Sequence, residues 1–311
     1  MASKPPRATE QRNPRTRRLD SKSTLEILRA IHREDATVAR AVARAIPAIA
    51  QAVDAISQAL QSGGRLFYVG AGTSGRLASL DAAEIPPTFG TPSRLVQAVI
   101  AGGRRALTHA VEGAEDNRAQ GARDLAERRV SRKDIVVGIA ASGSTPYVLG
   151  ALEFARRCRA VTIGVTSNPR SPLGQVAAIS IVTETGPETI AGSTRMKAGT
   201  AQKMVLNMLS TAAMVRMGRV YDNWMIGVAL TNRKLQARGL RILAEASGAT
   251  VAEATRALRQ SGHNMAESLI ILKSGVTARE AQRRLRNAGG NIRKALTLHE
   301  QTPKGPRKQH G

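Results

Sequence analysis

Two short loops rich in glycine and hydroxyl side chains are the parts of this chain best suited to hold a charged ligand. The first, GAGTSG, spans residues 70–75, and the second, ASGSTP, spans residues 141–146. Hydroxyls and backbone N–H groups at the start of a helix can bind the oxygens of a phosphate or a sugar. The pair favours a phosphorylated polyol as the ligand. The predicted substrate-binding residues in these loops are Thr73, Ser74, Gly75, Ser142, Gly143, Ser144 and Thr145.

The first loop also matches the G-x-G-x-x-G pattern of dinucleotide-binding sites, a weak match when taken alone. Such a site needs an acidic residue about 20 positions further on, at the end of the second strand. Residues 99–103 read VIAGG there, without an acid. We therefore disfavour a dinucleotide and expect no cofactor. The alternative for this loop is a glycine turn that Ser74 caps.

Two carboxylates are candidates for acid–base chemistry. Glu84 lies just past the helix expected after the first loop, among apolar and proline neighbours that can raise the pKa of an acid catalyst. Glu115 lies in the acidic segment 112–117, which can also be the first turn of a helix, favoured there by the helix dipole. Spacing alone leaves both open, because a glutamate is more often a solvated surface group.

The loops need a scaffold, and the sequence has the pattern of a parallel sheet. Short β-rich runs alternate with helical stretches, which predicts an α/β fold with helices on both faces. Ligands bind at the carboxyl ends of such strands, where the two loops fall. The predicted strands are 66–69, 95–100, 135–139, 161–165 and 179–182, and the helices between them are 75–83, 105–128 and 146–157.

Helical sequence flanks this region. Ser23 and Glu26 form a plausible capping box for a helix that carries Leu25 and Leu28, and a second helical stretch follows Pro47. Further helices are expected at 196–217, 233–246, 250–260, 264–273, 277–286 and 290–298, the last five as a small bundle. The predicted organisation is a basic irregular N-terminus (1–22), N-terminal helices (23–62), a sheet domain (63–218), a C-terminal helical region (219–299) and a basic tail (300–311).

Composition narrows the class of protein. Of the 311 residues 42% are hydrophobic but only 2% aromatic, so Ala, Val, Leu and Ile must fill the core. No apolar run reaches the length of about 18 residues that a membrane span requires, and the N-terminus lacks the apolar segment of a secretory signal. The single Cys158 excludes an intrachain disulfide, and the five histidines have no metal-ligand spacing. We expect a cytoplasmic protein without a membrane partner or a metal.

The net charge of +24 raises the alternative of nucleic-acid binding. Half of the excess lies at the ends, +5 in residues 1–22 and +7 in residues 279–311. Aromatic platforms for base stacking are too few, and no zinc-finger or RNA-binding signature is present. We therefore expect a solvated basic surface with no nucleic-acid partner.

Three longer segments resemble the N-acetylmuramic acid 6-phosphate etherases. They are LFYVGAGTSGRLASLDAAEIPPTFG, VVGIAASGSTPYVLGALEFA and GPETIAGSTRMKAGTAQKMVLNM. The resemblance covers roughly residues 8–298 and implies the doubly wound, five-stranded sugar isomerase (SIS) fold, a relation to the glucokinase regulatory protein, and a homodimer to which helix 196–217 contributes. The family usually has SGRTP where residues 142–146 of this chain read SGSTP, so Ser144 replaces the usual arginine.

The resemblance also implies the chemistry. It maps Glu84 and Glu115 onto the acid–base residues and brings Ser193, Thr194 and Lys197 close to the sugar, although Ser193 or Thr194 can alternatively cap the following helix. The implied reaction removes D-lactate from N-acetylmuramic acid 6-phosphate without a metal or redox cofactor. An aldose–ketose phosphosugar isomerase and a non-catalytic phosphosugar sensor remain as alternatives.

Overall fold

The chain forms two compact units. The computed structural model describes residues 8–228, 230 and 232–298, so the basic tail 300–311 lies outside the described residues. The first unit comprises the described residues up to Pro86 together with Thr91–Ala213. The second comprises Pro87–Gly90 and the described residues from Met214 onward. The helices that precede the sheet therefore belong to the same unit as the sheet.

The first unit is built on a parallel sheet of five strands in the order β2-β1-β3-β4-β5. All five strand predictions are confirmed to within one residue at each end. Every residue of β1 and β3 is buried, because helices cover both faces. The strands are β1 (Leu66–Gly70), β2 (Val96–Ile100), β3 (Ile135–Ile139), β4 (Val161–Thr166) and β5 (Ile179–Val182).

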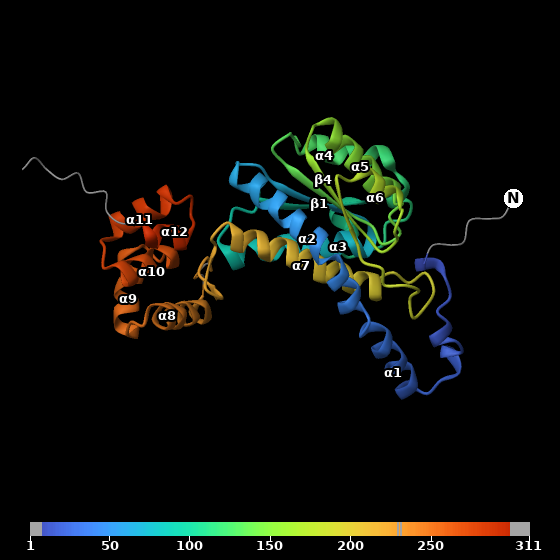
Figure 1. Cartoon of the computed structure of the whole chain (residues 1–311), viewed down its shortest axis with the longest axis horizontal. Coiled ribbons are helices and arrows are strands. Elements are labelled where there is room, and N and C mark those ends of the chain that lie inside the picture. The colour runs from blue at the N-terminus through green and yellow to red at the C-terminus, as the bar shows by residue number, and fades with distance from the viewer. Residues whose placement is uncertain (1–7, 229, 231, 299–311) are drawn as a thin grey trace, which may run out of the picture. The chain divides into compact units, whose positions relative to one another are not determined.

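Helices form a layer on each face of the sheet (Figure 1). The chain passes from β1 to the edge strand β2 and then crosses back to β3, so its winding direction reverses between β1 and β3. Right-handed crossovers in opposite directions place their helices on opposite faces, which confirms the doubly wound fold. One layer contains α4 (Arg118–Glu127), α5 (Pro146–Arg157) and α6 (Pro172–Val176), and the other contains α2 (Val38–Gln61), α3 (Gly72–Phe89) and α7 (Lys197–Arg216).

Helix α3 is longer than the predicted 75–83. It begins at Gly72 and continues through Pro86 and Pro87 to Phe89, although each proline removes one helical hydrogen bond. Ile85 and Phe89 are buried, and their packing holds the last turn. Similarly, α2 runs without interruption through Pro47, which was predicted to separate two helices.

The helix predicted over 105–128 is wrong for its first half. Only α4 is helical there, with Asn117 as its N-cap, and two short 3-10 helices precede it. Gly113, inside the predicted range, has a φ of +70°, which a continuous right-handed helix does not allow. The short helices are η4 (Gly103–Leu107) and η5 (Ala114–Asp116).

The basic N-terminal segment packs onto the first unit from residue 8 onward. The Thr16 hydroxyl donates to the carbonyl of Thr189 (2.8 Å), and the Gly192 N–H donates to the carbonyl of Thr9 (3.2 Å). This segment contains η1 (Ala8–Glu10), η2 (Pro14–Thr16) and η3 (Leu19–Ser21), and α1 (Thr24–Asp35) follows.

Helix α1 begins with the predicted capping box of Ser23 and Glu26 but buries an unexpected face. Leu25 and Leu28, which define its apolar pattern, are 56% and 57% exposed. Glu34 faces inward instead, at 2% exposure.

The second unit is a small bundle of helices with a short hairpin. Its helix predictions are confirmed to within two residues, and Gly275 ends α10 in the left-handed conformation. Among the described helices of the whole chain, none has both the length and the apolar character to cross a bilayer. The elements are β6 (Val220–Tyr221), β7 (Trp224–Met225), α8 (Arg233–Ser247), α9 (Val251–Gln260), α10 (Met265–Ser274), α11 (Ala278–Asn287) and α12 (Ile292–Thr297).

A buried ion pair joins α1 to α7 in the first unit. Lys197 Nζ lies 2.7 Å from Glu34 Oε2, and Arg15 Nε lies 2.7 Å from Glu34 Oε1. The Lys197 side chain is completely buried. Burial raises the pKa of Glu34, but the hydrogen bonds from Arg15 and Lys197 outweigh that effect and lower it to about 2.

Replacing Glu34 should therefore destabilise the first unit strongly. Glu34→Gln leaves the Lys197 ammonium buried without a carboxylate, and we expect a loss of about 3–5 kcal/mol in the free energy of unfolding. In the wild type this contribution is complete above pH 4.5, the ordinary pKa of a glutamate, and is lost as the pH falls toward 2. Urea unfolding followed by circular dichroism between pH 3 and pH 7 measures both effects.

The exposed pair of Glu245 with Arg241, 3.9 Å apart, provides the control. Glu245→Gln should change the free energy of unfolding by less than about 0.5 kcal/mol. An equally small loss for Glu34→Gln would contradict a stabilising role for the buried pair.

Candidate active site

The two hydroxyl-rich loops meet at the carboxyl edge of the sheet. Gly70, the last residue of β1, pairs with Ile139, the last residue of β3, so the loops that follow these strands are neighbours. The winding direction of the chain reverses at the same place. In open α/β sheets, ligands bind in the crevice that forms outside such a switch point. The structure thus brings together the two segments that the sequence singled out.

The first loop is the opening turn of α3. Gly72 has a φ of +51°. Thr73, Ser74 and Gly75 follow it in the first turn of α3, at the edge of the sheet. A Cβ at Gly75 would lie 2.5 Å from Cγ1 of Ile100, so this glycine is needed for close packing of α3 on β2. A substrate contact through Gly75 stays a prediction.

Ser74 is held by a residue that the sequence did not single out. Its hydroxyl donates to Oε1 of Gln202 on α7 (2.9 Å), and both side chains are buried. Within the described part of the chain, the Nε2 atom of Gln202 has no hydrogen-bond partner. Turning this amide over exchanges its donor and acceptor. With Nε2 toward Ser74, the hydroxyl proton of Ser74 becomes free for a phosphate oxygen.

The second loop is tightly organised. Gly143 has a φ of +65°, and a Cβ there would lie 2.4 Å from the Ser171 side chain. Ser142 Oγ accepts hydrogen bonds from the backbone N–H (3.2 Å) and the hydroxyl (3.1 Å) of Ser144. Thr145 occupies the N-cap position of α5, and Pro146 takes its first helical position. A ligand therefore meets a loop whose backbone is already ordered.

Residues 192–197, which include the predicted contacts Ser193, Thr194 and Lys197, lead into α7. The cap of this helix is not one of the hydroxyls suggested by the sequence. The buried carboxylate of Glu188 accepts the backbone N–H groups of Lys197 and Ala198, each at 2.9 Å. Burial raises the pKa of Glu188, and these hydrogen bonds offset part of that rise. The alternative that Ser193 or Thr194 caps this helix is therefore wrong, whereas their contact with substrate stays a prediction.

Lys197 was predicted to contact the substrate, but in the structure its charge is paired with a glutamate. Its side chain is fully buried, and its ammonium group binds Glu34. We therefore assign Lys197 to the ion pair that joins α1 and α7, and we leave it out of the proposed substrate contacts.

The two candidate catalytic carboxylates are both exposed. Glu84 lies within α3 rather than past its end, and the neighbouring Ile85 turns inward instead. Glu84 is therefore not enclosed by the apolar neighbours that the sequence led us to expect. Glu115 lies in η5, outside the helix that Asn117 caps. Neither carboxylate is engaged in the ion pairs of the first unit described above.

Asp81, one turn before Glu84 on α3, is the buried carboxyl of this region. Its Oδ1 accepts a hydrogen bond from the Ser210 hydroxyl on α7 (3.1 Å), and the residue is 7% exposed. Burial raises the pKa of Asp81 to about 6, and the hydrogen bond from Ser210 offsets part of the rise. Polar contacts from Ser74 and Asp81 thus attach α3 to α7.

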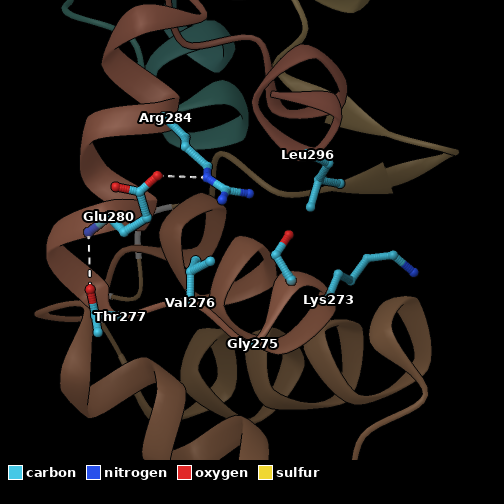
Figure 2. A pocket seen from close by; sticks show the side chains of 8 residues that line it. Lys273, Gly275, Val276, Thr277, Glu280, Arg284 and Leu296 are labelled. Carbon is cyan, nitrogen blue, oxygen red and sulfur yellow. Dashed lines mark hydrogen bonds and ion pairs between the residues drawn. The ribbon is translucent and has the colours of Figure 1, made fainter. Parts of the chain in front are cut away.

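A pocket of about 930 Å³ lies in the second unit (Figure 2). Its charged side chains bind one another or the protein backbone. Glu280 pairs with Arg284 (2.8 Å), as Figure 2 shows, and Lys273 donates to the carbonyl of Ala246 (3.3 Å). None of the predicted site residues lines this pocket. Across residues 8–228, 230 and 232–298, no three His, Cys, Asp or Glu side chains group closely enough to hold a metal ion.

The sequence of the first unit matches two family descriptions. The glucokinase regulatory protein N-terminal SIS domain matches residues 48–156, and the SIS domain matches residues 118–212. Among solved structures, the chain is similar to a phosphoheptose isomerase from Francisella tularensis, with a TM-score of 0.49 and 21% sequence identity over 62% of this chain and 98% of that one.

Three relatives match nearly the whole chain, and each is named N-acetylmuramic acid 6-phosphate etherase. The protein from Symbiobacterium thermophilum is 53% identical over 85% of this chain and 88% of its own. The protein from Actinobacillus pleuropneumoniae is 50% identical over 86% of this chain and 88% of its own. Etherase 1 of Bacillus licheniformis is 48% identical over 94% of this chain and 97% of its own.

The buried carboxyl of Asp81 predicts a distinctive dependence of stability on pH. Because its folded pKa of about 6 lies above the ordinary 3.8, its contribution is fully present below pH 3.8 and is lost as the pH rises through 6. Asp81→Asn keeps an acceptor for Ser210 but does not titrate. The free energy of unfolding of the variant, minus that of the wild type, should rise by about 2–3 kcal/mol between pH 4 and pH 8.

Urea titrations at five pH values across this range measure the difference. Ser210→Ala, which removes the hydrogen bond that favours the ionised form, should steepen the loss of stability with rising pH. A difference between Asp81→Asn and wild type that does not change with pH would contradict this assignment.

Proposed function

Because the chain belongs to the family of N-acetylmuramic acid 6-phosphate etherases, we propose that its carbon–oxygen lyase site cleaves the D-lactyl ether of N-acetylmuramic acid 6-phosphate. The products are N-acetylglucosamine 6-phosphate and D-lactate, which suits a role in recycling the amino sugars of the cell wall. The observation that carries this proposal is the identity of 48–53% over at least 85% of the chain. Incubating the protein with this substrate and assaying lactate tests it directly.

The phosphate of the substrate would bind between the loops that follow β1 and β3. Thr73, Ser74, Ser142 and Thr145 lie in the loops and helix starts at this edge of the sheet, and backbone N–H groups there suit an anion. Gly143 supports this role, because its positive φ and close contact with Ser171 leave the second loop little freedom to rearrange. Ser144, in the position of the usual family arginine, supplies a hydroxyl without a positive charge.

The reaction needs one base and one acid. In the open-chain sugar, C2–H lies α to the C1 aldehyde, and the ether oxygen lies on C3. A base takes the C2 proton, the C3–O bond breaks, and an acid gives a proton to the departing lactyl oxygen. Water then adds across the C2–C3 double bond, returning a proton to C2 and a hydroxyl to C3. Two carboxyls with different protonation states are sufficient for these steps.

We assign the acid to Glu84 and the C2 base to Glu115. Glu84 is the carboxyl on the helix that starts at the first loop, and Glu115 is the carboxyl on the loop that follows the neighbouring strand β2. Both are exposed in the described chain, so the bound sugar itself must exclude water from them.

The protein would act as a homodimer in the cytoplasm. Leu206 and Leu209 of α7 are fully buried within the chain, whereas Val215 near the end of the same helix is 48% exposed. Leu25 and Leu28 on α1 and Leu80 on α3 are 46–57% exposed. Light scattering should give a mass near twice 33.0 kDa at micromolar concentration. A mass of one chain would contradict the dimer.

Replacing either carboxylate should lower the rate without weakening substrate binding. Glutamine has nearly the same shape as glutamate but transfers no proton, so Glu84→Gln and Glu115→Gln should each reduce kcat by about 10²- to 10⁴-fold. KM should change little, because binding depends on the loops. Exchange of the C2 proton with deuterated solvent separates the two roles, since it needs only the base. Glu84→Gln should still exchange this proton, and Glu115→Gln should not.

Ser142→Ala provides the matched control. It removes a hydrogen bond to the charged phosphate, worth about 1.5–3 kcal/mol, so KM should rise while the C2 exchange at saturating substrate persists. Loss of exchange in Glu84→Gln but not in Glu115→Gln would mean that the two roles are reversed. Normal lactate release by Glu84→Gln would exclude the acid–base mechanism.

A further inference from the structure

Arg76, on the first turns of α3, holds the irregular segment between β2 and α4. Its Nε donates to the carbonyls of Ala106 (3.0 Å) and Leu107 (3.2 Å), and its Nη2 donates to the carbonyl of His109 (3.0 Å). All three acceptors belong to the main chain of a single segment. The guanidinium therefore clamps this segment to α3.

The clamped segment has little regular structure of its own. It contains only η4 and η5, separated by a stretch without helix or strand. Gly102, at the beginning of the segment, packs closely against Val111 from its later part. A Cβ at Gly102 would lie 2.9 Å from Cβ of Val111. At its end, Ala114 packs against the apolar core. Arg76 supplies the polar contact between these two apolar ones.

The clamp connects the two elements that carry the proposed acid and base. Glu115 lies in η5 at the end of the clamped segment, and Glu84 lies eight residues after Arg76 on the same helix. A helix advances 1.5 Å per residue, so α3 sets about 12 Å between Arg76 and Glu84 along its axis. A shift of the segment relative to Arg76 would therefore change the separation of the two carboxylates.

A guanidinium is the side-chain group suited to this task. Its rigid planar fork presents five N–H donors in fixed directions, so one side chain can serve three carbonyls at once. The lysine ammonium is a compact group on a flexible stem and does not fix the relative positions of several acceptors. Arg76 therefore fixes the position of the three carbonyl groups as well as supplying a charge.

We propose that Arg76 is a positioning residue that sets the placement of Glu115 relative to Glu84. This inference rests on the proposed function. It assigns Arg76 no contact with the substrate, and it predicts that loss of the clamp lowers the rate of proton transfer at C2 while the phosphate remains bound.

The test compares Arg76→Ala and Arg76→Lys with Arg104→Ala in the full-length protein. Arg104 is an exposed arginine of the clamped segment, so its removal makes the same change in charge. Thermal unfolding first verifies that each variant is folded. Hydrogen–deuterium exchange of residues 103–116 then reports on the clamp, and kcat, KM and C2 proton exchange report on the chemistry.

We expect Arg76→Ala to speed amide exchange in residues 103–116 and to lower kcat by about 10- to 100-fold, the effect of a misplacement of about 1 Å. Its KM should stay within about 3-fold of wild type, and its C2 exchange should fall in parallel with lactate release. Arg76→Lys should recover less activity than added guanidinium ion restores to Arg76→Ala. Arg104→Ala should behave as wild type in every measurement.

Several results would overturn the proposal. Faster amide exchange with unchanged kcat would make Arg76 a purely structural anchor. Unchanged amide exchange with a large rise in KM would make it a substrate ligand. A wild-type protein that releases no lactate would overturn the proposed function and the positioning role with it, whereas normal lactate release by Arg76→Ala would overturn the positioning role alone.

Discussion

The pairing of β1 with β3 is the interaction on which the candidate site depends. Parallel neighbours end at the same edge of a sheet, so the register of Gly70 against Ile139 makes neighbours of two loops about 70 positions apart. The same pairing requires the chain to reverse its winding direction, which places α3 and α7 on one face and α4 and α5 on the other. The location of the site is thus determined by the strand order, independently of the side chains.

Polar contacts between buried side chains then hold α7 in place. Its start is capped by Glu188 and tied to α1 through Lys197, and Gln202 and Ser210 bind Ser74 and Asp81 on α3. A core with few aromatic residues lets these helices approach closely, but small aliphatic side chains alone specify their register weakly. Each buried polar group has a strong requirement for its own partner, and together they allow one alignment.

Local patterns and long-range contacts explain what was predictable from the sequence. The strands and the C-terminal helices were predictable from local sequence patterns, and the location of both loops was predictable from the alternation of strands and helices. The burial of Lys197 did not, because its partner Glu34 is 163 residues away, and a lysine beside hydroxyls looks like a ligand for an anion. The exposure of Glu84 was also not predicted. We expected the helix to end before Glu84, but the packing of Ile85 and Phe89 extends it past both prolines.

The pairing of Glu34 with Lys197 also constrains how the chain is made. Synthesis proceeds from the N-terminus, so Arg15 and Glu34 emerge from the ribosome long before Lys197 does. Until then the inward-facing carboxylate can pair with Arg15, which is 66% exposed, but its fully buried partner Lys197 has not yet been made. The contact between α1 and α7 can therefore form only after all five strands have been translated, because Lys197 follows β5 in the chain.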